Sequence, residues 1–296
     1  MIFMRFDRFL TLCFFHRFHK TIRLPNGIRI PILMYHSISE SSEEGRHPYF
    51  KTSTSPRVFS EHIRILHARS YKVISLSSAV DLITGDSLSG KGKVAVITFD
   101  DGFEDFYTEA FPVLSRYGFC STVFMPAGFI SHAGRTFKGK KCLRWGEIRE
   151  LATSGVEFGS HTVTHPKLRD LRWDQVDMEL KESKKILEDG LGKGVGSFSY
   201  PYAFPDEDHR FKIRLKSSLL ASGYMNGVTT NIGTATRGDD RLFLKRIPVN
   251  SDDDPRFFSA KLDSGYDWVQ HLQYTFKFLK SKSGWKANSG SQETSQ

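Results

Sequence analysis

The stretch KVAVITFDDGF, residues 93–103, joins the clearest buried strand of the chain to two adjacent aspartates. The apolar, β-branched run from Lys93 to Phe99 predicts that strand. Two carboxylates side by side are costly unless one of them binds a cation or shares a proton. The sequence therefore raises the question of what compensates Asp100 and Asp101.

Strand and helix patterns alternate along most of the chain. Strands are predicted at 30–36, 72–76, 93–99, 120–126, 156–160, 197–201, 224–228 and 243–249, and helices at 55–70, 77–85, 104–117, 143–155, 173–188, 207–222 and from Pro255 onward. Repeated strand–helix units indicate parallel strands that are joined by helical crossovers. We therefore expect an α/β fold, a distorted (β/α) barrel of about seven parallel strands, rather than a doubly wound sheet.

Composition excludes some classes of protein. The 296 residues carry a net charge of +9, and no apolar run approaches the roughly 18 residues of a membrane-spanning helix. Cys13, Cys120 and Cys142 are widely spaced and odd in number, which favours a reducing compartment over a disulfide framework. No nucleic-acid-binding signature accompanies the basic excess, so a nucleic-acid partner is not expected.

The ends of the chain differ from its middle. Residues 1–29 form a basic aromatic segment that lacks the small-residue cleavage site of a secretory signal. On a helix, its apolar residues share one face: Ile2, Phe3, Phe6, Phe9, Leu10, Cys13 and Phe14. This helix either packs on the main domain, residues 30–280, or lies on an anionic membrane surface. The corresponding location is cytoplasmic, including the inner membrane surface. The polar tail 281–296 is predicted to be disordered.

Side chains that can carry chemistry follow the predicted strands. Because the C-terminal ends of parallel barrel strands meet at one rim, these side chains should lie close together. They are His36, Asp100, Asp101, Ser160, His161, His165, Pro201, Tyr202, and either Arg246 or Asn250.

The segment HTVTH, residues 161–165, places two imidazoles four residues apart, on one face if the segment is helical. With a carboxylate from Asp101 or Asp100, they complete a set of two histidines and one carboxylate. That set suits a hydrolytic zinc or cobalt site and equally a non-haem iron oxygenase. If Asp101 binds the cation, Asp100 can remain ionised beside it as a general base.

Three ordered motifs, TFDDG (98–102), SHTVTH (160–165) and FSYPY (198–202), resemble the polysaccharide deacetylase family, which is carbohydrate esterase family four. The likeness covers roughly residues 30–265. The stretch PILMYHSI (31–38) resembles a permuted subgroup that includes poly-N-acetylglucosamine deacetylases. The resemblance implies that Asp100 is the general base and that Tyr202 gives its backbone N–H to an oxyanion hole. It also implies a divalent metal on Asp101, His161 and His165, with zinc expected first and cobalt, nickel or manganese as alternatives.

The chain departs from the family pattern in two places. The late Leu-x-His motif that usually carries the general acid is missing, so His36 is the expected substitute. Ser199 stands where the family often has the arginine that orients the catalytic aspartate, and Arg246 could supply that guanidinium. Trp145, Pro201 and Tyr202 are candidate substrate-binding residues, although a core role for Trp145 is equally compatible with its pattern.

The function that the resemblance implies is a metal-dependent hydrolase. Its substrate would be an N-acetylated glycan, either a polysaccharide or a glycan precursor, from whose amino sugars it would remove acetyl groups. The alternative from another class is a catalytically silent glycan- or lipid-binding module on the same fold. A pure binding module would not need the charged set of two aspartates and two histidines.

Overall fold

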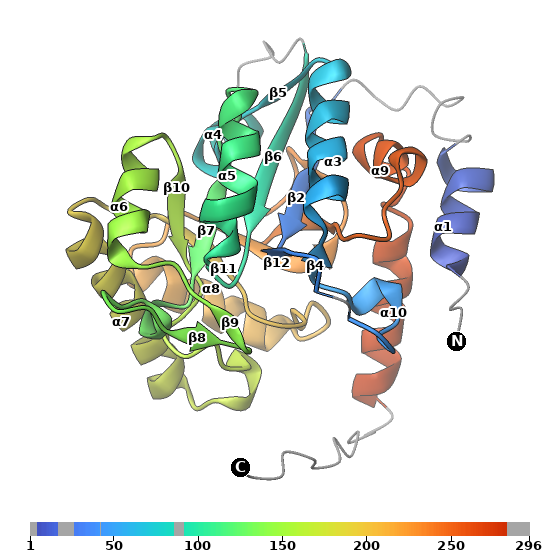
Figure 1. Ribbon diagram of the computed structural model, residues 1–296. Helices are drawn as coiled ribbons and strands as arrows, with labels where there is room; N and C mark the ends of the chain where they lie inside the picture. The colour runs from blue at the N-terminus through green and yellow to red at the C-terminus, as the bar shows by residue number, and fades with distance from the viewer. Residues whose placement is uncertain (1–4, 17–26, 42, 86–91, 283–296) are drawn as a thin grey trace.

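Seven parallel strands close into a barrel in the computed structural model, which describes residues 5–16, 27–41, 43–85 and 92–282 (Figure 1). Around the barrel the order is β2, β14, β12, β11, β10, β7 and β6, and β6 pairs again with β2 to close the sheet. The predicted (β/α) barrel of about seven parallel strands is confirmed.

The barrel strands are β2 (Ile32–Tyr35), β6 (Lys93–Phe99), β7 (Thr122–Met125), β10 (Glu157–Ser160), β11 (Ser197–Ser199), β12 (Asn226–Ile232) and β14 (Leu244–Pro248), and β5 (Tyr71–Val73) adds to β6. Short pairs join β1 (Arg29–Ile30) to β13 (Ala235–Thr236), β3 (Ser37–Ile38) to β4 (Ser53–Thr54) and β8 (Thr136–Phe137) to β9 (Lys140–Lys141). The outer helices are α3 (Pro56–Ala68), α4 (Leu76–Thr84), α5 (Phe111–Arg116), α6 (Trp145–Thr153), α7 (Trp173–Leu191), α8 (His209–Ala221), α9 (Pro255–Leu262) and α10 (Val269–Lys282).

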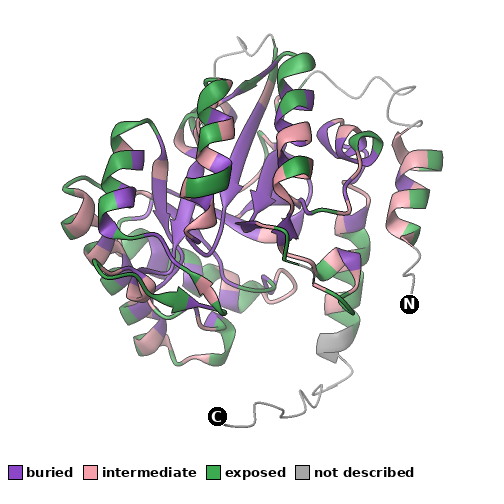
Figure 2. Ribbon diagram, in the orientation of Figure 1, coloured by how far each residue is buried: buried purple, intermediate pink, exposed green. Residues whose placement is uncertain are grey.

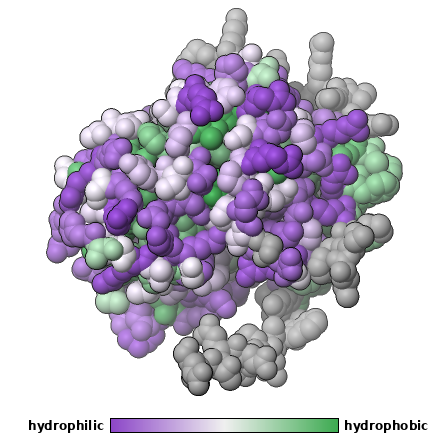
Figure 3. Space-filling view, in the orientation of Figure 1, coloured by the Kyte–Doolittle hydropathy of each residue, from purple (hydrophilic) through white to green (hydrophobic). Residues whose placement is uncertain are grey.

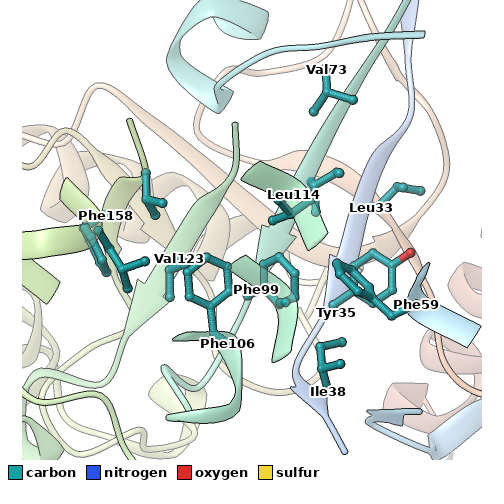
Figure 4. Close-up of a cluster of buried hydrophobic side chains, with 14 of the residues drawn as sticks. Leu33, Tyr35, Ile38, Phe59, Val73, Phe99, Phe106, Leu114, Val123 and Phe158 are labelled. Carbon is teal, nitrogen blue, oxygen red and sulfur yellow. The ribbon is translucent and has the colours of Figure 1, made fainter. Parts of the chain in front are cut away.

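The strands are buried and the helices expose their outer faces (Figure 2). The core beside β6 consists of aromatic and branched side chains (Figure 4). The ring of Phe99 lies 4.8 Å from that of Phe106 and 5.4 Å from that of Tyr35, distances typical of favourable aromatic pairs. Because Phe99 directly precedes Asp100, this packing fixes the point at which the chain leaves the barrel.

Two helical predictions needed correction. The segment predicted as one helix at 104–117 is a π-helical turn, η3 (Phe106–Ala110), that continues into α5. The sequence patterns did not reveal α10 as a helix. In contrast, α9 begins as expected at Pro255, and the Asp254 carboxylate accepts hydrogen bonds from backbone N–H groups of the first turn.

The N-terminal helix packs on the body of the protein. It consists of α1 (Phe6–Leu10) and the π-helical turn η1 (Thr11–Phe15). The Trp268 indole donates to Thr11 Oγ1 over 3.0 Å, and its ring stacks on Phe15 at 4.6 Å. The prediction that this helix packs on the main domain is therefore correct for the described residues. Ile2 and Phe3 lie outside them, as does the predicted tail from residue 283 on, whereas Ser281 and Lys282 end α10.

The opposite side of this helix is open. Phe6, Phe9 and Phe14 keep 62%, 55% and 58% of their surface exposed. Figure 3 shows apolar side chains at the edge of the molecule where Figure 1 places α1. Within the described part of the chain, every helix is too short or too polar to span a lipid bilayer.

Candidate active site

Asp100 is compensated by a buried arginine. Arg246, which is fully buried in β14, donates from Nη1 to Asp100 Oδ1 over 2.8 Å and from Nη2 to Oδ2 over 2.7 Å. Ser199 Oγ donates to the same carboxylate and accepts from Arg246. Burial raises the pKa of Asp100, but the charge and hydrogen bonds of Arg246, together with His161 and His36, outweigh it, and the pKa falls to about 2. Arg246 thus occupies the orienting role expected from the sequence.

Asp101 faces the two histidines. Asp101 Oδ1 lies 3.8 Å from His161 Nε2 and 3.3 Å from His165 Nε2, and all three side chains are buried. Among the described residues, Oδ1 has no hydrogen-bond donor. An unpartnered buried carboxylate oxygen that points at two imidazole nitrogens fits a bound cation, and the three ligand atoms lie within 4.8 Å of one another.

The tautomer of His161 favours the same interpretation. Its Nδ1 lies 2.8 Å from the backbone oxygen of Ser199, an acceptor that requires the proton on Nδ1. The Nε2 lone pair is then directed towards Asp101, as in histidines that bind metals. Burial lowers the pKa of His161 to about 3, which keeps the ring neutral.

The loop 161–165 is not helical, contrary to the condition under which the spacing would place both imidazoles on one face. Thr162 and His165 have left-handed backbones, with φ of 68° and 58°. The buried carboxylate of Glu179, from α7, holds this loop by accepting from the N–H groups of Val163 and Thr164 over 2.7 and 3.0 Å. The imidazoles converge because the loop turns sharply.

Left-handed backbones recur at this site. Asp101 and Tyr202 also have positive φ, 71° and 58°. Each such residue other than glycine costs of order 1–3 kcal/mol and persists only where its surroundings impose it. The barrel rim therefore stores strain in the segments that carry its polar side chains.

Lys138 was not among the predicted site residues. It lies in the turn between β8 and β9, and its ammonium donates to Asp101 Oδ2 over 3.0 Å. Lys138 binds only Oδ2 of Asp101, which leaves Oδ1 available to a cation between the two histidines. The only feature of the sequence that could have pointed to Lys138 is the basic run KGKK, residues 138–141, and nothing in the sequence connects this run to Asp101.

His36 and Tyr202 stand at the same rim. The half-buried His36 follows β2, and burial lowers its pKa, while the charges of Asp101 and Asp100 act to raise it. The ring of Tyr202 is 45% exposed and meets that of His165 edge-on at 4.6 Å. Pro201 is buried beside it.

Trp145 does not belong to the rim. It begins α6, is 9% exposed and lies within the main hydrophobic core. Its indole packs so closely against Gly190 of α7 that a Cβ there would lie 2.1 Å from the ring. The structure corrects the proposed sugar-binding role: Trp145 is a core residue that joins α6 to α7.

Known proteins resemble this chain in sequence and in fold. The sequence profile described as polysaccharide deacetylase matches residues 88–215. YxkH of Bacillus subtilis, a candidate polysaccharide deacetylase, is 31% identical over 243 residues, which cover 82% of this chain and 79% of that protein. The chain belongs to the polysaccharide deacetylase family.

Two further relatives narrow the comparison. The deacetylase PplD of Streptococcus pyogenes, solved with acetate, superposes with a TM-score of 0.68 at 27% identity, over 80% of this chain and 99% of that one. The poly-beta-1,6-N-acetyl-D-glucosamine N-deacetylase of Staphylococcus epidermidis is 26% identical over 214 residues, 68% of this chain and 69% of that protein. These matches fit the permuted subgroup that the sequence resembled.

We predict that Glu179→Ala weakens zinc binding roughly 10–100-fold, because the loop that positions His161 and His165 loses its anchor. Zinc affinity can be measured by competition with a chromophoric chelator. Glu182→Ala, an exposed glutamate on the same helix, is the matched control and should match wild type. Equal zinc affinity in both variants would show that the loop holds its shape without Glu179.

Proposed function

We propose that this protein is a metal-dependent N-deacetylase of amino sugars in a polysaccharide or glycan precursor. The observation that carries the proposal is the buried Asp101–His161–His165 cluster directly beside Asp100, which Arg246 keeps ionised. Membership of the polysaccharide deacetylase family supports it. A silent binding module is not favoured, because it would have no use for a compensated base beside a cation site.

Asp101, His161 and His165 would hold the divalent cation, and their two imidazoles and one carboxylate suit zinc. When bound, such a cation acts as a Lewis acid towards the amide carbonyl and lowers the pKa of water towards ~7. Lys138 neutralises the second oxygen of Asp101 and thereby orients the carboxylate.

The protein's own groups would then move the protons. Asp100 accepts a proton from the attacking water, and its depressed pKa means that it is ready to do so throughout the neutral range. The backbone N–H of Tyr202 is assigned to the developing oxyanion. His36 is assigned to protonating the leaving amine. Burial lowers the pKa of His36, and the negative charges of Asp101 and Asp100 offset part of that shift.

Acetate release from an N-acetylglucosamine oligomer tests the proposal. The zinc-loaded protein should release acetate, and a chelator should abolish the release until zinc is restored. Asp100→Asn should retain zinc by elemental analysis but lose roughly 10²–10⁴-fold in kcat, because the general base is gone.

Two companion variants separate the roles. His161→Ala should lose both zinc and activity, whereas His36→Ala should keep zinc and lose rate. The proposal is wrong if the zinc-loaded wild type releases no acetate from any N-acetylated amino sugar, or if Asp100→Asn turns over at the wild-type rate.

The pH dependence of kcat/KM should reveal what Arg246 does. In the wild type, Asp100 stays ionised down to about pH 2, so it contributes no acidic limb near neutrality. In Arg246→Met, the largest cause that lowers the pKa of Asp100 is gone, so burial should raise this pKa well above its wild-type value. The acidic fall of kcat/KM should then begin at a higher pH than in the wild type.

Arg246→Lys is the control, because it keeps the charge without the two-pronged hydrogen bond. It should restore most of the wild-type pH profile. Identical acidic limbs in wild type and Arg246→Met would show that Arg246 does not set the charge of Asp100.

We also propose that α1 and η1 contact anionic membranes. The exposed Phe6, Phe9 and Phe14 suit the boundary between headgroups and acyl chains, and residues 1–29 carry a net positive charge in the sequence. Replacing the three phenylalanines with serine should reduce co-sedimentation with phosphatidylglycerol vesicles several-fold. Serine at the exposed Met178, Ile213 and Leu220 is the control. Equal sedimentation of both triple variants would refute the contact.

A further inference from the structure

An apolar groove lies between α10 and the barrel rim. Its volume is about 660 Å³, within the roughly 300–1,000 Å³ of small-molecule sites. Its apolar lining includes Met34, Tyr49, Phe50, Ile232, Leu272 and Phe276. The short 3₁₀ helix η2 (Pro48–Phe50) lies against α10 and contributes one edge (Figure 1). We call it the α10 groove.

The polar side chains on its α10 wall are already engaged. Gln273 Oε1 accepts from the N–H of Ile232 over 3.0 Å, and its Nε2 donates to the carbonyl of Thr230 over 3.1 Å. The ammonium of Lys277 donates to the carbonyl of Phe204 over 2.7 Å. A sugar needs hydrogen-bonding partners for its hydroxyls, and these groups are already bonded to backbone atoms and, for Lys277, also to Asn231 Oδ1. The α10 wall of the groove therefore presents a mainly apolar surface to a ligand.

Residues that line the groove are neighbours of the rim residues along the chain. Ala203, which lines it, directly follows Tyr202, and Thr230 Oγ1 donates to the carbonyl of Tyr202 over 3.0 Å. Met34, on its other side, lies two residues before His36 in the same strand end. A molecule whose acetamido group reaches the rim can thus place another part in the groove.

Three apolar side chains at the groove face water. Phe50, Leu272 and Phe276 are 65%, 57% and 70% exposed. Such a concentration of exposed large apolar residues indicates a binding surface rather than an ordinary protein surface. None of the three supports the core, so each can be replaced without loss of the fold.

The net charge also favours one class of occupant. In the sequence, residues 278–286 carry Lys280, Lys282 and Lys286 and no acidic residue. Lipids that carry sugars through phosphate linkages, and the membranes that hold them, are anionic, and a basic sequence complements them. The apolar groove suits a hydrocarbon chain, and the basic sequence at the end of α10 favours an anionic carrier.

We propose that the α10 groove binds the hydrocarbon chain of a lipid-linked amino sugar, so that the substrate is a glycolipid rather than a free polysaccharide. This inference rests on the proposed deacetylase function for its catalytic half. The groove places the chain beside the rim while the acetamido group reaches Asp100 and the metal cluster.

A chain-length series tests it. The substrates are N-acetylglucosamine β-glycosides with methyl, butyl, hexyl and octyl aglycones, used below their micellar concentrations. Burying one methylene increases affinity by roughly fourfold, so kcat/KM should rise by up to that factor per carbon. Leu272→Ser/Phe276→Ser and Phe50→Ser should flatten this slope and leave the methyl glycoside unchanged. Ile213→Ser, a 70% exposed residue on α8, should keep the wild-type slope.

Calorimetric binding of the same glycosides to Asp100→Asn keeps the two proposals apart. If affinity for Asp100→Asn rises with chain length but the zinc-loaded wild type releases no acetate, the groove is supported and the deacetylase function is refuted. Acetate release that is indifferent to chain length would support the function and refute the glycolipid. Octyl β-glucoside, which has no acetamido group, completes the set. If it binds but longer aglycones give no gain in kcat/KM, the hydrocarbon belongs to another molecule and the proposal is wrong.

Two other occupants have their own signatures. If an N-acetylglucosamine tetramer displaces the octyl glycoside and the serine variants weaken the tetramer equally, the groove is a sugar subsite. If light scattering shows a wild-type dimer that the serine variants convert to monomers, a second copy of the chain covers the groove. Either result overturns the proposal.

Discussion

The two adjacent buried carboxylates are the constraint on which the rest of the site depends. Each is 2% exposed, and each has its own compensation. Arg246 forms a two-pronged bond to Asp100, whereas Asp101 has two imidazoles on one oxygen and Lys138 on the other. Burying either charge alone would cost several kcal/mol. The compensating groups come from three separate segments, β14, the loop 161–165 and the turn between β8 and β9, which the closed barrel brings to one rim.

That arrangement requires unusual backbone geometry, and the surrounding hydrogen bonds maintain it. Positive φ angles at Asp101, Thr162, His165 and Tyr202 would relax in a loosely held loop. Here the Glu179 carboxylate holds the loop that carries both histidines, and the aromatic core around Phe99 fixes the strand that delivers both aspartates. Strain and packing together leave Asp101 Oδ1 facing the imidazoles with no donor among the described residues.

The apolar surfaces of the protein lie close to its two ends. Trp268 joins them, because it contacts Thr11 and Phe15 of the N-terminal helix and directly precedes α10. One surface exposes the phenylalanines of α1 and η1, and the other forms the α10 groove beside the rim. The candidate active site and an apolar groove thus lie near each other at the barrel rim, and the glycolipid proposal rests on this arrangement.

The sequence by itself determined the alternation of strands and helices, the aspartate pair and the histidine pair, because periodicities and local motifs are properties of neighbouring residues. It favoured a barrel, but the pairing of β2 with β6 that closes the barrel is seen only in the tertiary structure. The sequence also suggested Arg246, as a charge at a strand end. Only the tertiary structure decided that Trp145 is core, that Lys138 reaches Asp101, and that Glu179 supports the histidine loop. These contacts join residues 16 to 45 positions apart or depend on burial, and no local pattern encodes which distant side chain will fill a given space.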